Sequence, residues 1–525
     1  MTISATGVAQ EKDYGSVVPA GARAGDLTLA PCNVHLEGDN RQYAGDCGTL
    51  VVPENRNDPG SRLIALPVTR VNATGKQPLE PLFWFQGGPG SPNKMGYPTD
   101  GLLERHDLVM VGYRALDGQV HIQCPEISDA LRNVDKDYLG RDSLNRYAEG
   151  AKACVNRLAV EGIDLDGYSI NQTIEDNEAA RKALGYERIN LFGNSYGTRV
   201  QMLYQWRHPD SIHRNVMVAV NPPGHFIFDP QSLERILQKY SRFCQQDAYC
   251  SSRTPDLYAT MQQVERNMPR SWMGIDIDPD LVKFITNIGW HESLGTSAMP
   301  LHAPAAIDMW LDAAEGDASG MALVSLLAPL ILPEAFDWGH FFSMGGSVPD
   351  FNDPDRDYLA ELATDTGDTV IGSPLSLFHA GIMPGWTVST DQSVGEVQAS
   401  DIETLMIGGT LDGSTPFEYA RDELLPHLSN GHQVVIKGQG HTETFWYSQD
   451  EARARLLNTY FESGKVDDSL FVDQPPLFDV DTSWGGIAKA LLAVVIVVLS
   501  AIALVTGLVI RKLLRNSSYR KTVEA

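Results

Sequence analysis

The sequence lacks the residue spacings of a metal site. Its six cysteines include no C-x-x-C pair, and its histidines do not fall at the spacing of a zinc site. We therefore expect neither a metal ion nor an organic cofactor.

Positive charge is also scarce. Lys and Arg number 41 against 67 Asp and Glu, which gives a formal net charge of -26 at pH 7. Nucleic-acid binding depends on clustered Lys and Arg that neutralise phosphates, so this composition argues against a nucleic-acid partner. It suits a protein with an acidic surface or one that attracts cationic substrates.

The cysteines stand as three neighbouring pairs along the chain. An even number in this arrangement favours three local disulfides, although six cysteines permit fifteen pairings. Disulfides imply an oxidising compartment, whereas the alternative is six buried thiols in a cytosolic enzyme. The expected pairs are Cys32–Cys47, Cys124–Cys154 and Cys244–Cys250.

One apolar run near the C-terminal end is long enough to cross a membrane. Residues 491–510 carry no charge, and a helix of this length spans the hydrocarbon core. An acidic stretch with Trp484 precedes the run, and several Lys and Arg follow it. By the positive-inside rule we predict a transmembrane helix over 485–510, a cytoplasmic tail over 511–525, and the large remainder of the chain outside the cytoplasm.

The start of the chain lacks the apolar core of a signal peptide. It begins MTISATGVAQEKDYG, which is polar. This conflicts with an extracytoplasmic location, so two alternatives stay open. Either export uses a signal that is missing from the start of this chain, or the protein is inserted by its tail alone and the topology is reversed.

Strand-like and helical stretches alternate over most of the chain. Runs such as LIALPVTRV and DLVMVGYR are typical of strands, whereas TIEDNEAARKALG is typical of a helix that ends at Gly185. This alternation predicts an α/β fold with a mostly parallel sheet covered on both faces. A helical region interrupts it. The expected parts are a flexible segment at 1–30, core at 31–225, a helical cap at 226–395, core again at 396–464, and a linker at 465–484 that leads to the membrane helix.

The motif G-x-S-x-G occurs once as GNSYG, at residues 193–197. In this motif a serine sits on a sharp strand-to-helix turn, and small residues on both sides let the backbone bend without a clash. The strand-like RINLF precedes it and the helical TRVQMLYQW follows. Because three fixed positions match by chance in many chains, Ser195 needs partners before it is a candidate nucleophile.

Those partners follow in the chain order that the fold requires. A serine hydrolase needs a His to take the proton, a carboxylate to orient that His, and backbone N–H groups for the oxyanion. Asp412 follows the apolar TLMIGG, and His441 follows the strand-like HQVVIKGQG. Taken alone, Asp412 is typical of an aspartate that forms a turn, and His441 is typical of a histidine on the protein surface. Together with the glycine-rich FQGGPGSP they predict a triad with Ser195, and oxyanion donors at Gly88 and Tyr196.

These segments resemble the proline iminopeptidase and tripeptidyl aminopeptidase family of serine α/β-hydrolases. FQGGPGSP is similar to the family's HGGPG-type loop, and GNSYGTRV, GTLDGSTP and GQGHT are similar to its three triad segments. The resemblance covers roughly residues 45–460, with Gln86 where the family often has His. It implies the α/β-hydrolase fold with a helical cap, and hydrolysis of a peptide bond near a free N-terminus or of carboxylic esters.

An aminopeptidase also needs a carboxylate for the substrate amine. The segment NIGWHESLG supplies Glu292, which is similar in position to the family's cap glutamate, and Trp290 as an apolar or cation-π wall. The alternative for Glu292 is a solvated glutamate in a helix. The functional hypothesis is a membrane-anchored serine exopeptidase that acts on peptides with a free N-terminus. A carboxylic-ester hydrolase of the same fold is the alternative, and an inactive membrane-anchored binding protein is the remote one.

Overall fold

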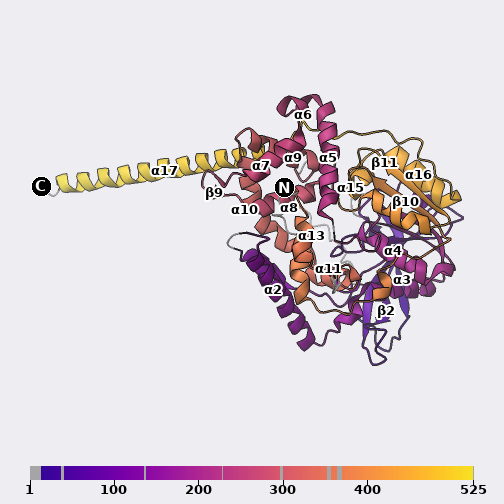
Figure 1. The fold of residues 1–525 in the computed structure, drawn as a ribbon. Coiled ribbons are helices and arrows are strands. Elements are labelled where there is room, and N and C mark those ends of the chain that lie inside the picture. Colours follow the sequence, from indigo (N-terminus) through magenta and orange to yellow (C-terminus); the bar gives the residue numbers. More distant parts are fainter. Residues whose placement is uncertain are drawn as a thin grey trace.

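A computed structural model shows an α/β core packed against a layer of helices, from which one long helix extends (Figure 1). It describes residues 14–36, 41–134, 137–227, 229–295, 300–351, 356–362 and 369–523, with side chains as far as residue 513.

Nine strands form one sheet in the order β1-β2-β3-β5-β4-β6-β7-β10-β11. The first three neighbouring pairs are antiparallel and the other five are parallel. The predicted α/β class with a mostly parallel sheet is therefore confirmed, and the parallel strands all end at one edge. The strands are β1 (Leu27–His35), β2 (Gln42–Pro53), β3 (Leu63–Val71), β4 (Leu82–Phe85), β5 (Leu108–Val111), β6 (Ile189–Asn194), β7 (Ile212–Val218), β10 (Glu403–Gly409) and β11 (Gly431–Ile436).

Strand β4 shows why the strands in the middle of the sheet have apolar sequences. All four of its residues are buried, because successive side chains point to opposite faces and both faces are covered. Phe83 and Phe85 belong to the apolar cluster that contains residues of α3 and α4. Leu82 and Trp84 belong to the cluster on the other face, which contains residues of α15 and α16.

The helices of the core connect these strands. Helix α3 ends at Gly185 with a φ of 78°, a left-handed cap that glycine adopts without a steric cost, as the sequence predicts. The core helices are α3 (Ile170–Leu184), α4 (Tyr196–Arg207), α14 (Phe417–Tyr419), α15 (Thr442–Tyr447) and α16 (Asp450–Ser463).

The helical layer is larger than the expected cap at 226–395. Helices α1 (Pro125–Arg132) and α2 (Arg141–Val160) precede that range, yet they pack against α10 and α13. A two-stranded hairpin of β8 (Ser271–Trp272) and β9 (Ile275–Asp276) also belongs to this layer. The other cap helices are α5 (Pro230–Gln246), α6 (Ala248–Arg253), α7 (Leu257–Arg266), α8 (Pro279–Gly289), α9 (Ala303–Ala314), α10 (Ser319–Ile331), α11 (Trp338–Gly345), α12 (Tyr358–Leu362) and α13 (Pro374–Ile382).

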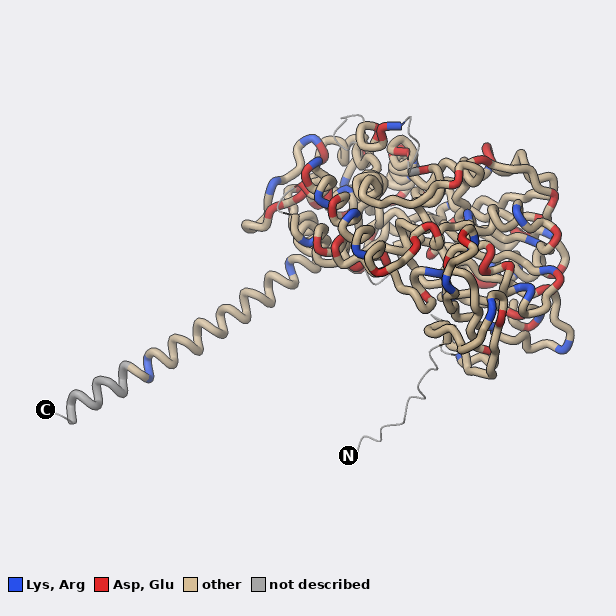
Figure 2. Tube along the Cα trace, turned by 90° about the horizontal axis from the view of Figure 1, so that it is seen from below, with Lys and Arg blue, Asp and Glu red and all other residues tan. Residues whose placement is uncertain are grey.

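The expected linker at 465–484 lies along the folded protein and returns to the cap. The Leu477 N–H donates to the carbonyl of Leu294 over 3.1 Å, and Phe478 is buried. The long helix α17 (Trp484–Val523) therefore starts on the cap. Figure 2 shows it projecting from the body, with uncharged residues along its middle.

The six cysteines pair as neighbours, which confirms the expected disulfides. Cys32–Cys47 joins β1 to β2, Cys124–Cys154 joins the start of α1 to α2, and Cys244–Cys250 joins α5 to α6. These three bonds account for all the cysteines of the chain.

Candidate active site

Ser195 sits on a sharp turn between β6 and α4. Its φ of 53° and ψ of -130° lie in a region that non-glycine residues rarely adopt. The two glycines of the motif make this turn possible, because a Cβ on Gly193 or on Gly197 would lie 2.3 or 2.2 Å from the carbonyl oxygen of Phe85. The Ser195 N–H donates to the Val218 carbonyl over 2.9 Å, which fixes the turn between two strands.

His441 and Asp412 complete a hydrogen-bonded chain with this serine. His441 Nε2 lies 2.9 Å from Ser195 Oγ, and His441 Nδ1 lies 2.9 Å from Asp412 Oδ2. Because a carboxylate only accepts, Nδ1–H donates to Asp412, and in the neutral ring Nε2 is left to accept from the serine hydroxyl. The three predicted residues are thus brought together, each at the carboxyl end of a parallel strand.

Asp412 and His441 each stabilise the charged form of the other. Burial tends to raise the pKa of Asp412, but the charge of His441 and hydrogen bonds from His441 and Thr415 lower it to about 2. Burial tends to lower the pKa of His441, yet the neighbouring Asp412 raises it above its ordinary value. Asp412 is therefore ionised at neutral pH, and it stabilises a protonated His441.

The glycine-rich loop after β4 lies directly against the serine. A Cβ on Gly87 would come within 2.7 Å of Ser195 Cβ, and Gly88 has a φ of 111°. The loop is braced by Asn93 Oδ1, which accepts from the Gln86 N–H over 2.9 Å. Close approach of bare backbone to the reacting serine is the condition for an oxyanion site.

The cap holds the far side of this loop. The N–H of Gly90 donates to His340 Nδ1 of α11 over 2.9 Å, and the Asp337 N–H donates to the Gly90 carbonyl over 3.2 Å. His340 is buried and stacks on Tyr113, whose hydroxyl donates to the Gln86 carbonyl over 2.9 Å. Burial lowers the pKa of His340 to about 4, which keeps Nδ1 free to accept. No local sequence pattern indicates this contact between distant segments.

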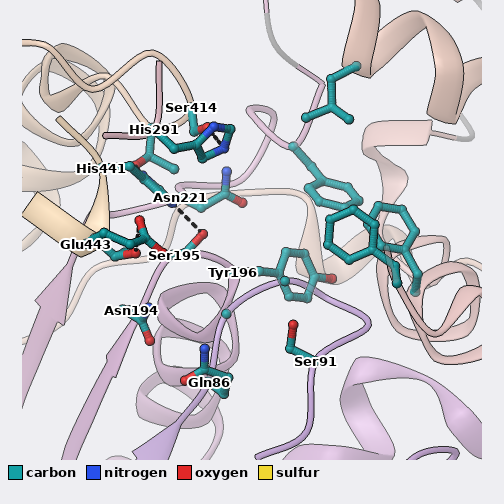
Figure 3. A pocket seen from close by; sticks show the side chains of 18 of the residues that line it. Gln86, Ser91, Asn194, Ser195, Tyr196, Asn221, His291, Ser414, His441 and Glu443 are labelled. Atoms are coloured by element: carbon teal, nitrogen blue, oxygen red, sulfur yellow. Dashed lines mark hydrogen bonds between the residues drawn. The ribbon is translucent and has the colours of Figure 1, made fainter. Parts of the chain in front are cut away.

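A cavity of about 220 Å³ opens at Ser195 and has two chemically different ends. Figure 3 shows Glu443 on one side of Ser195 and Tyr196 on the other, toward a group of rings. Its polar lining includes Gln86, Asn194 and Glu443, and its apolar lining includes Leu375 and the contacting rings of Phe226, Phe336 and Phe341.

Glu292 and Trp290, predicted to face the substrate amine, are not among the residues that line this cavity. Trp290 is 1% exposed and packs beside Tyr240. Glu292 Oε1 accepts from the Leu294 N–H over 2.6 Å, and burial raises its pKa. The prediction is corrected because the chain turns between α8 and α9, so that neighbouring residues of the segment face in different directions.

His291, between these two residues, is the member of the segment that reaches the site. Its carbonyl accepts from the His441 N–H over 2.7 Å, and its ring stands edge-on to that of His441 at 5.2 Å. Its Nδ1–H donates to the Ile288 carbonyl over 2.8 Å, so Nε2 accepts from the Ser414 hydroxyl over 2.5 Å. Burial, followed by the charge of His441, lowers the pKa of His291 and keeps it neutral.

Glu443 is the carboxylate that sequence reasoning missed at this site. It lines the cavity two residues after His441, and its Oε2 accepts from the Thr442 hydroxyl over 3.0 Å. The helix α15 that begins at Thr442 sets its direction. Its nearness in sequence to His441 is the one signal that could have found it.

Two further features bear on the chemistry and location. Among the described residues, no group of three or more His, Cys, Asp or Glu side chains is arranged to hold a metal ion. One described helix is by itself long and apolar enough to cross a membrane, over Trp484–Leu513.

Known proteins resemble this chain over different parts of its length. A family model described as TAP-like protein matches residues 382–471, which include Asp412 and His441. The tripeptidyl aminopeptidase of Streptomyces lividans is 28% identical over 199 residues, which cover 34% of this chain and 36% of that protein. The chain thus spans about a third of the length of the first curated relatives that it matches. The serine protease Hip1 of Mycobacterium tuberculosis is 22% identical over 455 residues, which cover 76% of this chain and 82% of that protein.

Solved structures match at low similarity. The serine hydrolase CCSP0084 from Cycloclasticus zankles has a TM-score of 0.34 and 12% identity, with 84% of this chain and 100% of that chain covered. An esterase from Exiguobacterium antarcticum has a TM-score of 0.35 and 13% identity, with 76% and 96% covered. By the family model and the curated relatives that it matches, the chain is therefore similar to tripeptidyl aminopeptidase-like serine hydrolases over parts of its length.

Proposed function

We propose that the protein is a membrane-anchored serine exopeptidase that releases an N-terminal residue or a short peptide through an acyl-enzyme. The observation that carries this proposal is the continuous chain of hydrogen bonds from Asp412 through His441 to Ser195 at the mouth of a cavity. The peptidase names of the relatives support the choice of substrate class.

In the proposed reaction Ser195 Oγ attacks the scissile carbonyl while His441 Nε2 takes its proton. Asp412 holds the imidazole tautomer and stabilises the imidazolium that forms. His441 then protonates the leaving amine, and a water molecule repeats the cycle on the ester of Ser195. The first proton transfer runs along the 2.9 Å contact between Ser195 Oγ and His441 Nε2.

The oxyanion of the tetrahedral intermediate is proposed to bind the backbone N–H groups of Gly88 and Tyr196. Tyr196 is the first residue of α4, where an N–H has no partner within its own helix and the helix dipole favours negative charge. Gly88 belongs to the loop that packs on Ser195 and is held from behind by His340. Such preorganised donors are worth about 2.7 to 4 kcal/mol each in transition-state stabilisation.

Glu443 is proposed to bind the α-amine of the substrate, the role that the sequence assigned to Glu292. Among the residues that line the described cavity, Glu443 is the one carboxylate. It is half-buried and lies beside Ser195 in Figure 3, where an ammonium group on a short acyl chain would meet it. A hydrogen bond between two charged groups in such a cleft is stronger than a neutral one.

A carboxylic-ester hydrolase is the second candidate, and the apolar end of the cavity favours it. Phe226, Phe336, Phe341 and Leu375 form a wall without a charged group, which suits an apolar acyl chain. The same triad and oxyanion donors serve both reactions.

The location of the protein is part of the proposal. Helix α17 is proposed to span a membrane over 485–510, with the basic residues 511–525 in the cytoplasm and the catalytic domain on the other side. The three disulfides support an oxidising compartment for that domain.

The test is a substrate panel on the full chain in detergent, with Ser195→Ala as the control. Matched p-nitroanilides of proline, alanine and a tripeptide are compared with their N-acetylated forms and with p-nitrophenyl acetate. We expect cleavage of the free-amine anilides only, and the shortest substrate that is cleaved gives the number of residues released. Equal cleavage of the acetylated anilides would refute the dependence on a free N-terminus, and ester cleavage without amide cleavage would establish the ester hydrolase instead. Full activity in Ser195→Ala would refute both.

A further inference from the structure

Helix α17 leaves the cap without a spacer before its apolar run. Trp484 and Ala488 are 7% and 5% exposed, so the first turns of α17 are packed on the protein. Leu491, where the uncharged run begins, is already 48% exposed. The three residues from Ala488 to Leu491 rise about 4.5 Å along a helix. A bilayer spanned by this run therefore begins within a few ångströms of the cap surface.

The contact between α17 and the cap is tight and holds the helix in a fixed direction. A Cβ on Gly320 of α10 would lie 3.1 Å from Trp484 Cβ, and a Cβ on Gly485 would lie 2.7 Å from Asp312 Oδ2. Lys489 Nζ also lies 2.5 Å from Asp317 Oδ2. Because two backbones approach this closely, the cap cannot swing freely about the base of α17.

Large apolar side chains are exposed on the cap elements next to this exit point. Met273 at the tip of the β8–β9 hairpin is 72% exposed, and Leu326, Leu330 and Ile331 of α10 are 51%, 68% and 60% exposed. We call these four residues the apolar rim. Helix α10 contacts both α17 and the hairpin, and Figure 1 shows β9 and α10 beside the base of α17.

The composition of α10 is unusual for a helix with a face open to water. Residues 318–333 include no charged side chain, whereas the exposed face of a helix in a soluble protein normally carries charged and polar residues. Charged residues are spread over the rest of the body, including the part of the cap next to the base of α17 (Figure 2). An apolar exposed face beside a membrane helix is the pattern of a surface that lies in the lipid interface.

We propose that the apolar rim rests in the headgroup region of the same bilayer that α17 spans, so that the cap of the enzyme faces the membrane and the α/β core faces away from it. The proposal rests on the membrane anchoring given under the proposed function. The occupant is the lipid surface because α17 brings that surface to the rim, and each of the four side chains gains by leaving water.

The experiment uses the full chain in vesicles of phosphatidylcholine and phosphatidylglycerol. All six native cysteines are in disulfides, so one introduced cysteine can be labelled alone. An environment-sensitive fluorophore is attached in separate variants at Met273→Cys, Leu330→Cys, Leu499→Cys in the middle of α17, and Ser429→Cys on the exposed turn before β11. Quenching is then measured with lipids that carry a spin label near the headgroup or deep in the acyl chain.

We expect the headgroup quencher to remove most of the fluorescence at 273 and 330 and to leave 429 unchanged, while the deep quencher acts on 499. Quenching at 499 without quenching at 273 and 330 would overturn the proposal and leave membrane anchoring intact. A blue-shifted but unquenched label at 273 would also overturn it, in favour of a second copy or another protein on the rim. No quenching at 499 would overturn the anchoring itself, and the proposal with it.

A second variant tests whether the apolar rim brings the cap into contact with the bilayer. Leu330→Glu places a charge where the interface is proposed, and it lies outside the active site. Quenching at 273 should fall severalfold in this variant while quenching at 499 stays the same. Unchanged quenching at 273 would count against the proposal.

Discussion

The α/β core and the cap differ in how their residues serve the reaction. The core supplies the residues proposed to make and break bonds, Ser195, Asp412 and His441, each at the end of a parallel strand. The cap supplies groups that act from outside, such as His340 against the oxyanion loop and His291 over His441. The sheet fixes positions through its hydrogen-bond ladder, whereas the cap positions depend on how helices pack.

The largest expected effect comes from the core. Asp412→Asn should lower kcat by about 10⁴-fold, because the amide no longer holds the imidazole tautomer that accepts from Ser195. The measurement is kcat on the best substrate of the panel, with circular dichroism to show that the fold is kept. A loss of less than tenfold would mean that another group orients His441.

The same variant should change the pH dependence. Activity requires neutral His441, so it is lost as the pH falls through the pKa of this residue, which Asp412 raises. Without the carboxylate that pKa falls, and the acid limb of the pH profile should move to lower pH. Asp412 itself, with a pKa of about 2, adds no limb near neutrality. If the acid limb does not move, the group that titrates in this limb is not His441.

Glu443 should produce a smaller effect, limited to substrates with a free amine. Glu443→Gln removes the charge but keeps the shape, and loss of a charged hydrogen bond costs about 1.5 to 3 kcal/mol, or about 10- to 150-fold in kcat/KM. Any basal turnover of acetylated or ester substrates should be unaffected. The matched control is Glu292→Gln, which lies outside the cavity lining and should leave kcat/KM unchanged. The reverse result would restore Glu292 as the amine site.

Substitution of the cap residue His340 should lower kcat and leave KM nearly unchanged. His340→Leu leaves the buried N–H of Gly90 without its acceptor, which costs about 1 to 3 kcal/mol and loosens the oxyanion loop. We expect about tenfold lower kcat with little change in KM, and partial rescue in His340→Asn, whose side chain can again accept. Loss of stability without loss of kcat would show that His340 only stabilises the fold through its packing.

His340 also gives the folded protein a pH dependence in stability. Its folded pKa is about 4 against an ordinary value near 6.5, so the unfolded chain takes up the proton first. Stability is therefore full above the ordinary value and is lost as the pH falls toward about 4. His340→Asn should reduce the acid-induced fall in the melting temperature between these values.

The smallest expected effect is the difference in stabilisation between two disulfides of the helical layer. Cys124–Cys154 spans 30 residues and Cys244–Cys250 spans 6. On the loop-entropy model, the longer loop should stabilise the protein by about 1 kcal/mol more. Replacing each pair by alanine and comparing the melting temperatures checks this. A larger loss from the short loop would mean that α6 depends on its disulfide for packing.

The core could be predicted well from the sequence because its signals are local. Ser195 is recognised from the two glycines that let its turn pass β4, and Asp412 and His441 from the apolar runs that precede them. Strands buried on both faces have apolar runs, so the sheet also follows from the sequence. The disulfide partners are near in the chain, and their pairing followed from that nearness.

The cap could be predicted only as a helical region. Nothing local indicates that α1 and α2 pack on it, that residues 465–484 return to it, or that α17 starts there at Trp484. The choice of Glu292 failed for the same reason, since the side chain that reaches a cavity depends on how the segment turns against another element.

The sequence by itself determined the residues proposed for the chemistry, a serine, an aspartate and a histidine in this order at strand ends, and one apolar helix at the C-terminal side. The tertiary structure alone decided that His291 and Glu443 border the site and that α17 leaves from the cap beside an apolar rim. Backbone turns and strands depend on residues a few positions apart, which a sequence displays. Contacts between the cap, the core and α17 join residues far apart in the chain, and side-chain packing decides them only when the chain folds.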